Sequence, residues 1–156
     1  SHFLSYFCTM YSGILIFHIV ISVLLMILSS YILVRSIFGM VGKVSFSTFH
    51  DIKLPIIAVI CLYLELILGI LLYAIYINKL ETLITQANAT TYFSARFWAL
   101  EHAILMMFAI IFGHLGLVYA KNLSDDNQKF KKNLLYFGLS AVLIFISITM
   151  NMFRNA

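Results

Sequence analysis

Charged residues are scarce in this sequence. Ten lysines and arginines and six acidic residues make up 10% of the 156-residue chain, whereas 63% of it is hydrophobic. An ordinary soluble domain has about 25% charged residues, and so few charges cannot form a polar exterior around a domain of this size. The composition therefore excludes a soluble enzyme, a disordered chain and a nucleic-acid-binding module. It predicts an integral membrane protein whose first partner is lipid.

Cysteine clusters and nucleotide-binding signatures are also missing. The two cysteines, Cys8 and Cys61, form no CxxC or Cys/His cluster, so neither a zinc site nor a disulfide scaffold is indicated. The sequence contains no P-loop, GxGxxG or HExxH motif. We therefore do not expect a stand-alone enzyme. Because the sequence begins at Ser1, we expect its natural start to be missing or processed.

Long apolar runs are abundant instead. A membrane span needs about 20 mostly apolar residues, and four runs qualify: 11–34, 54–77, 97–120 and 134–153. Their length favours helices, because β-barrel strands would be about ten residues long and strictly alternating. Short connections favour antiparallel neighbours. The sequence thus predicts an all-α membrane protein, a single domain over residues 1–156, folded as an up-down bundle of four transmembrane helices.

The basic residues predict an orientation. They concentrate in the first and third loops, at Arg35, Lys43, Lys53, Lys121, Lys129, Lys131 and Lys132. Because basic loops stay in the cytoplasm, both termini and the second loop, 78–95, are expected on the outer, periplasmic side. We expect the chain in a bacterial inner membrane.

Small and polar residues mark one face of each span. Lipid provides no hydrophobic force between helices, so such residues indicate packing faces. They recur at spacings of three and four, which keeps them on one side of a helix. The predicted inward faces include His18, Ser22, Leu25 and Ser29; Ala58, Cys61, Glu65 and Gly69; His102, Met106, Ala109, Gly113 and Gly116; and Asn133, Tyr136, Ser140 and Ser147.

Two of these inward residues are histidines at similar predicted depth. Counting about 1.5 Å per residue, His18 lies roughly 10 Å and His102 roughly 7 Å below the outer boundary. Two imidazoles from different helices are the axial ligands that a b-type haem requires. Met106, one turn below His102, could line the ring or act as an alternative soft ligand. The competing interpretation is that both histidines only form hydrogen bonds between helices.

The remaining ionisable residues within the spans are further candidates, because such groups are costly in lipid. Glu65, near the predicted midplane, is expected either to be protonated or to pair with a cation. Its role would be a proton relay, a counter-charge to a cofactor, or a hydrogen bond that packs one helix on another. Arg96 could bind a haem propionate or lipid phosphate, or could pair with Glu101 at the start of the third span. His114 points about 120° away from His102, so we expect it to face a neighbouring helix or another subunit.

Several of these residues also carry a family resemblance. The sequence resembles a family of small four-helix membrane proteins common in Bacteroidetes, often labelled cytochrome b-like. The resemblance rests on Arg96-Phe97 with Glu101-His102 and Met106-Met107, on Glu65-x-x-x-Gly69-x-x-x-Tyr73, and more loosely on His18. Members often carry a histidine in the second helix near Tyr63 or Leu64, and this sequence does not. His18 and His102 are then the available pair of ligands.

The leading hypothesis is a membrane-embedded, b-type cytochrome-like electron-transfer subunit with haem b between the first and third helices. A quinone or a redox protein near the outer face would exchange electrons with it. The alternative is a non-catalytic accessory subunit of a larger membrane complex, without a cofactor. A small ion or proton channel ranks last, because the polar residues do not form a continuous file.

Overall fold

The chain folds into four long helices. The computed structural model describes the backbone of residues 2–84 and 89–154 and the side chains of residues 10–75 and 100–150. The helices are α1 (His2–Met40), α2 (Leu54–Ile84), α3 (Ala89–Asn122) and α4 (Asp126–Arg154), and no strand occurs in the described backbone. Four stretches are long and apolar enough to cross a membrane: Met10–Met40, Phe49–Ile75, Leu100–Asn122 and Asp126–Met150. The prediction of an all-helical chain with four such stretches is confirmed.

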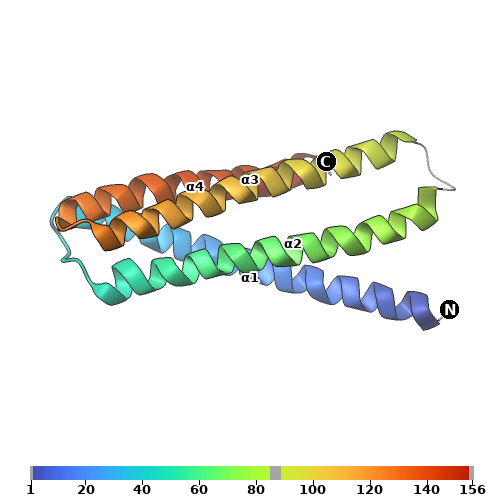
Figure 1. Cartoon of the computed structure of the whole chain (residues 1–156), viewed down its shortest axis with the longest axis horizontal. Helices are drawn as coiled ribbons and strands as arrows, with labels where there is room; N and C mark the ends of the chain where they lie inside the picture. The colour runs from blue at the N-terminus through green and yellow to red at the C-terminus, as the bar shows by residue number, and fades with distance from the viewer. Residues whose placement is uncertain (1, 85–88, 155–156) are drawn as a thin grey trace.

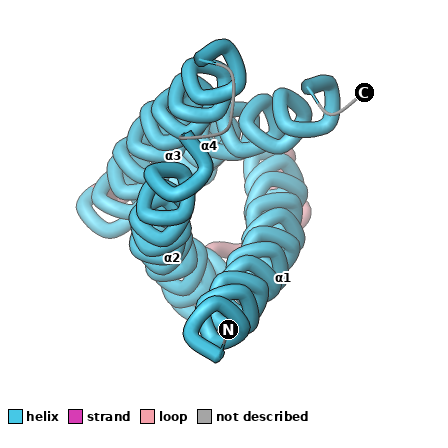
Figure 2. The backbone as a smooth tube through the Cα atoms, turned by 90° about the vertical axis from the view of Figure 1, so that its right-hand side faces the viewer, coloured by secondary structure: helices cyan, strands magenta, loops and turns pink. Residues whose placement is uncertain are grey.

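The helices run alternately in opposite directions. The α1–α2 and α3–α4 connections lie at one end of the molecule, which we call the basic end, and the N and C termini lie at the other (Figure 1). Viewed along the bundle, the helices surround a common centre (Figure 2). α1 and α3 each pack against both α2 and α4, so α1 and α3 are diagonal partners. Side chains from α1 and α3 can therefore meet only across the centre of the bundle.

The helices are longer than the apolar runs that predicted them. α1 already includes His2, and the predicted second loop, 78–95, is helical up to Ile84 and again from Ala89. The number of consecutive apolar residues gives the length of helix that lies within the hydrocarbon core of the membrane. It does not detect polar turns that continue the same helix beyond that core.

A short π-helical segment, η1 (Phe49–Lys53), links α1 to α2. Before it the chain turns at Gly42, whose φ of 73° is unfavourable for residues with a side chain. The Arg35 guanidinium donates to both carboxylate oxygens of Asp51, at 2.7 and 2.8 Å, and the Ser47 backbone N–H donates to the same carboxylate at 2.7 Å. These contacts fix the loop between the first two helices against α1.

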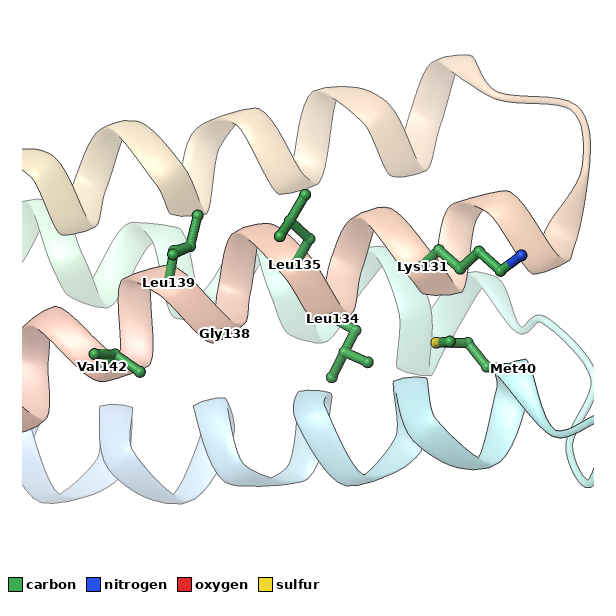
Figure 3. A pocket seen from close by; sticks show the side chains of 7 residues that line it. All are labelled: Met40, Lys131, Leu134, Leu135, Gly138, Leu139 and Val142. Atoms are coloured by element: carbon green, nitrogen blue, oxygen red, sulfur yellow. The ribbon is translucent and has the colours of Figure 1, made fainter.

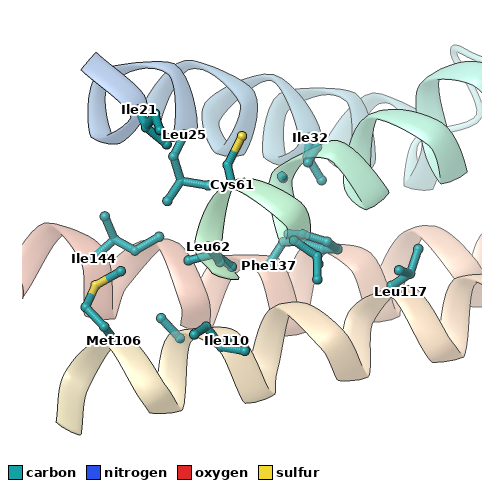
Figure 4. Packing of buried hydrophobic residues seen from close by; sticks show 13 residues of the cluster. Ile21, Leu25, Ile32, Cys61, Leu62, Met106, Ile110, Leu117, Phe137 and Ile144 are labelled. Atoms are coloured by element: carbon teal, nitrogen blue, oxygen red, sulfur yellow. The ribbon is translucent and has the colours of Figure 1, made fainter. Parts of the chain in front are cut away.

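The predicted inward faces form the core. The buried residues include Leu25, Ala58, Cys61, Met106 and Ala109, together with the polar Glu65, Asn133, Ser140 and Ser147. Figure 4 shows part of this packing, with side chains of all four helices meeting at the centre. The outward faces carry large exposed apolar side chains such as Phe17, which is 63% exposed, Ile27 and Phe145. The molecule therefore has an apolar outside as well as an apolar core.

Candidate functional site

The first polar contact inside the bundle joins α1 to α2. His18 Nδ1 lies 2.6 Å from Glu65 Oε2, and the Glu65 side chain is only 2% exposed. The alignment is not that of a ring N–H hydrogen bond, because His18 Nδ1 is a buried atom without a hydrogen-bond partner among the described residues. The second carboxylate oxygen, Glu65 Oε1, is also buried and has no hydrogen-bond partner among these residues. The contact is short, and the carboxyl group keeps an oxygen without a donor among the described residues.

The second polar contact joins α3 to α4. The Ser147 hydroxyl and His102 Nδ1 are 2.5 Å apart and form a hydrogen bond whose donor depends on the ring tautomer. Ser147 is buried and His102 is partly buried. A hydroxyl can either donate to or accept from an imidazole nitrogen, so this bond can persist in either tautomer.

The two contacts meet at one level. The rings of His18 and His102 have centroids 6.2 Å apart and planes inclined by 66°. His18, Glu65, His102 and Ser147 therefore form one cluster, to which each of the four helices contributes one residue. We call these four residues the polar layer. It brings together the two histidines that the sequence predicts as a pair.

An apolar floor lies one turn from the polar layer, toward the basic end. It is formed by buried residues spaced three or four positions from the polar ones, namely Ile21, Leu62, Met106 and Ile144. Met106 belongs to this floor and packs with the other three in the same hydrophobic cluster (Figure 4). The floor seals the polar layer on that side.

Gly69 lies on the opposite side of the polar layer. Among the described residues, a methyl group built at Gly69 would have one neighbour within 4 Å, the His18 Cε1 atom at 3.9 Å. Gly69 lies one turn beyond Glu65 on α2, so it faces the same interior as the carboxyl group.

The separation of the two rings is that of two imidazole ligands on one metal ion. Metal–imidazole bonds are about 2 Å long, and two rings on opposite sides of one ion then have centroids about 6 Å apart, close to the observed 6.2 Å. A histidine that binds a metal through Nε2 commonly has Nδ1 held by a carboxylate or another polar group. Here Nδ1 contacts Glu65 in one ring and Ser147 in the other.

The other predicted site residues are Arg96, Glu101 and His114. The Arg96 side chain lies outside the described residues. Glu101 is partly buried beside His102. His114 is exposed on α3, and the prediction that it faces a neighbouring helix or another subunit stays a prediction. The described residues include no group of three or more His, Cys, Asp or Glu side chains arranged for a bare metal ion.

Sequence analysis missed two features of this interior. It placed Glu65 near the midplane and did not identify His18 as its partner, because depths were counted from an assumed start of the first span and α1 begins before that point. It also treated Ser147 only as a packing residue. The sequence did indicate that both residues lie on inward faces. It did not indicate their partners, because these depend on how the helices are aligned along their length.

No protein-family model matches this chain, and no curated protein or solved structure is significantly similar to it. The resemblance to the cytochrome b-like family therefore stays a prediction.

Proposed function

We propose that this chain is an integral membrane subunit that binds haem b in its polar layer and transfers electrons. A membrane location is supported by the outward faces, where residues such as Phe17, Ile27 and Phe145 are exposed. Exposed apolar surface of this extent is unfavourable in water, whereas lipid tails solvate it. The four helices are long enough to cross a bilayer. Their backbone N–H and C=O groups bond to one another within each helix, as is required where no water is available.

One observation carries the haem proposal. Two imidazoles from diagonally opposite helices meet across the bundle centre at 6.2 Å, and each contacts a polar side chain of another helix through Nδ1. His18 and His102 would hold the iron through Nε2. The Nδ1 atoms would then carry protons, with His18 directed at the Glu65 carboxylate and His102 donating to the Ser147 hydroxyl.

The neighbouring residues have supporting roles in this proposal. Glu65 would hold the His18 ring in place through its contact with Nδ1. The apolar floor excludes water from the side facing the basic end. Arg96, about two turns into α3, would bind a propionate group. Bound haem b would supply one-electron chemistry, and the electron donor or acceptor, a quinone or a redox protein, would approach from the end that carries the termini.

The test is a reduced-minus-oxidised absorbance spectrum of protein purified from haem-supplied cells. We expect a b-type α-band that disappears in His18→Ala and in His102→Ala. His114→Ala is the matched control, since it removes an exposed histidine of the same helix as His102, and it should keep the band. Folded protein without any band contradicts the proposal, and a band that persists in His102→Ala contradicts the ligand pair.

A non-catalytic accessory subunit is the second candidate, and the position of His114 favours it. An imidazole on an apolar helix surface is costly in lipid unless another group covers it, and His114 is exposed on α3 between exposed Ile111 and Val118. A neighbouring subunit would provide that group. Colourless protein that co-purifies stoichiometrically with a larger membrane complex would support this candidate over the first.

A further inference from the structure

A second feature of the molecule lies on its outside, away from the polar layer. A groove of about 400 Å³ follows the surface of α4 where α1 lies beside it. Its lining is almost entirely apolar and comes from Met40, Lys131, Leu134, Leu135, Gly138, Leu139 and Val142. Figure 3 shows these side chains along one stretch of α4, with Met40 of α1 facing the end near Lys131.

Gly138 shapes the middle of this groove. A methyl group built at Gly138 would meet one atom within 4 Å, Leu33 Cδ2 at 3.7 Å. The absence of a side chain therefore leaves an indentation between Leu134 and Val142, rather than a close contact between the helix backbones. Because no neighbouring helix fills the indentation at Gly138, a ligand can occupy it.

The only charged group of the lining stands at one end. Lys131 is exposed in the first turns of α4, at the basic end. Its neighbours are engaged elsewhere: Lys129 pairs with Asp126 at 2.8 Å, and the Lys132 ammonium lies over the Tyr119 ring at 5.1 Å. Within the described part of the chain, Lys131 has no ion pair and no aromatic ring beneath it.

The length of the groove matches one membrane leaflet. From Lys131 to Val142 a helix rises about 16 Å at about 1.5 Å per residue. Half of a hydrocarbon core of about 30 Å is about 15 Å. With Lys131 at the headgroup level, the apolar lining would therefore reach the bilayer centre, which is the depth to which one lipid tail extends.

We propose that this groove binds an anionic phospholipid, with its phosphate on Lys131 and one acyl chain along α4 over Gly138. The charge at the mouth, the apolar lining and the leaflet-long path together select a lipid over a soluble ligand. Neighbouring bulk lipid would touch the same surface, but a lysine without a partner favours anionic headgroups. This proposal rests on the membrane location proposed above and is independent of haem binding.

The experiment measures lipid selectivity on protein in nanodiscs made of phosphatidylcholine and phosphatidylglycerol. Native mass spectrometry after gentle release gives the ratio of the two lipids retained. We expect wild-type protein to keep one phosphatidylglycerol preferentially. Lys131→Gln should reduce that preference about fivefold, the worth of one surface lysine of about 1 kcal/mol. Gly138→Leu should lower retention of either lipid by filling the groove.

Lys53→Gln is the matched control, because it neutralises another exposed lysine at the basic end that does not line the groove. It should leave the preference unchanged. An unchanged preference in Lys131→Gln, or an equal loss in Lys53→Gln, overturns the proposal, and so does a polypeptide retained on α4 in place of lipid. Protein extracted from membranes by alkaline carbonate would instead contradict the membrane location itself. Because Lys131→Gln changes only an exposed side chain, the test does not depend on whether Gly138→Leu folds.

Discussion

At the residue scale, His18 and His102 differ in the side chain that each contacts through Nδ1. His18 contacts a carboxyl group, which can carry a full charge, whereas His102 contacts a hydroxyl group, which cannot. A carboxylate partner makes an imidazole a stronger electron donor to a metal than a hydroxyl partner does. The two rings are therefore chemically unequal before any ligand binds, and Glu65 is the residue through which the interior can carry a negative charge.

Replacing Ser147 by alanine tests whether its hydrogen bond positions His102 for a ligand. Losing a polar partner of a metal-binding histidine commonly costs about 10–100-fold in affinity, so we expect a loss of that size in haem affinity. The loss of stability should be small, about 0.6 kcal/mol, as for hydrogen bonds between membrane helices. Haem titration of apoprotein and unfolding in detergent measure the two quantities.

Ser140→Ala is the control for Ser147→Ala. The Ser140 hydroxyl, also buried on α4, donates to the Ala109 carbonyl oxygen at 2.9 Å, so it links the same two helices without contacting a histidine. We expect a similar loss of stability and unchanged haem affinity. Equal affinity losses in the two variants would show that Ser147 acts only by holding α3 to α4.

At the element scale, the Arg35–Asp51 pair fastens the π-helical segment to α1. Asp51 is 4% exposed and accepts hydrogen bonds from Arg35 and from the Ser47 backbone. Asp51→Asn leaves the Arg35 charge without its partner in a largely buried place, and we expect a loss of about 3 kcal/mol in unfolding free energy. Titration with a denaturing detergent, followed by helical circular dichroism, measures it.

The same substitution at Asp126 is the control for Asp51. The Asp126 carboxylate also pairs with a cation, Lys129 at 2.8 Å, but its side chain is 57% exposed. Water competes with exposed ion pairs, so Asp126→Asn should cost less than about 1 kcal/mol. If both variants lose the same small amount, burial does not strengthen the Arg35 pair.

Close packing of α3 on α4 depends on Gly116. A methyl group built there would lie 2.9 Å from ring atoms of Phe137, which is 1% exposed and has no space to move. Gly116→Ala should therefore destabilise the bundle by about 1–3 kcal/mol through overpacking. Gly138→Ala, with its nearest contact at an ordinary 3.7 Å, should be neutral or stabilising by up to about 1 kcal/mol. Unfolding of both variants in the same detergent checks the contrast, and equal effects would argue against it.

These elements also show what the sequence could predict. The four helices and their inward faces depend on local patterns, apolar length and spacings of three and four, so residues such as Ala109 and Ser140 could be placed in the core beforehand. The alignment of one helix along another depends on summed contacts such as Gly116 with Phe137, which no local pattern contains. The histidine pair was thus predictable as a possibility, whereas the Glu65 and Ser147 partners were not. The π-helical segment was missed because the pair that holds it joins residues 16 positions apart.

At the scale of the whole molecule, the distribution of charge predicts how the bundle sits in a membrane. Lysines and arginines in and beside the α1–α2 and α3–α4 connections belong to the basic end, among them Arg35 near the end of α1, Lys43 in the first connection and Lys131 near the start of α4. Because such residues resist transfer across the membrane, the basic end should be cytoplasmic and the polar layer should lie nearer the outer surface. Any redox partner of the polar layer would then approach from the periplasm.

Reporter fusions test this orientation. We expect alkaline phosphatase, which is active only outside the cytoplasm, to be active when fused after Ala156 and inactive when inserted at Ser124, between α3 and α4. A fluorescent protein that folds only in the cytoplasm should give the opposite pattern at the same two sites. Replacing Lys129, Lys131 and Lys132 together by glutamine removes three of the four lysines beside the α3–α4 connection, and should produce a mixed population in both assays. Active phosphatase at Ser124 in the unaltered chain would reverse the assignment and place the polar layer nearer the cytoplasm.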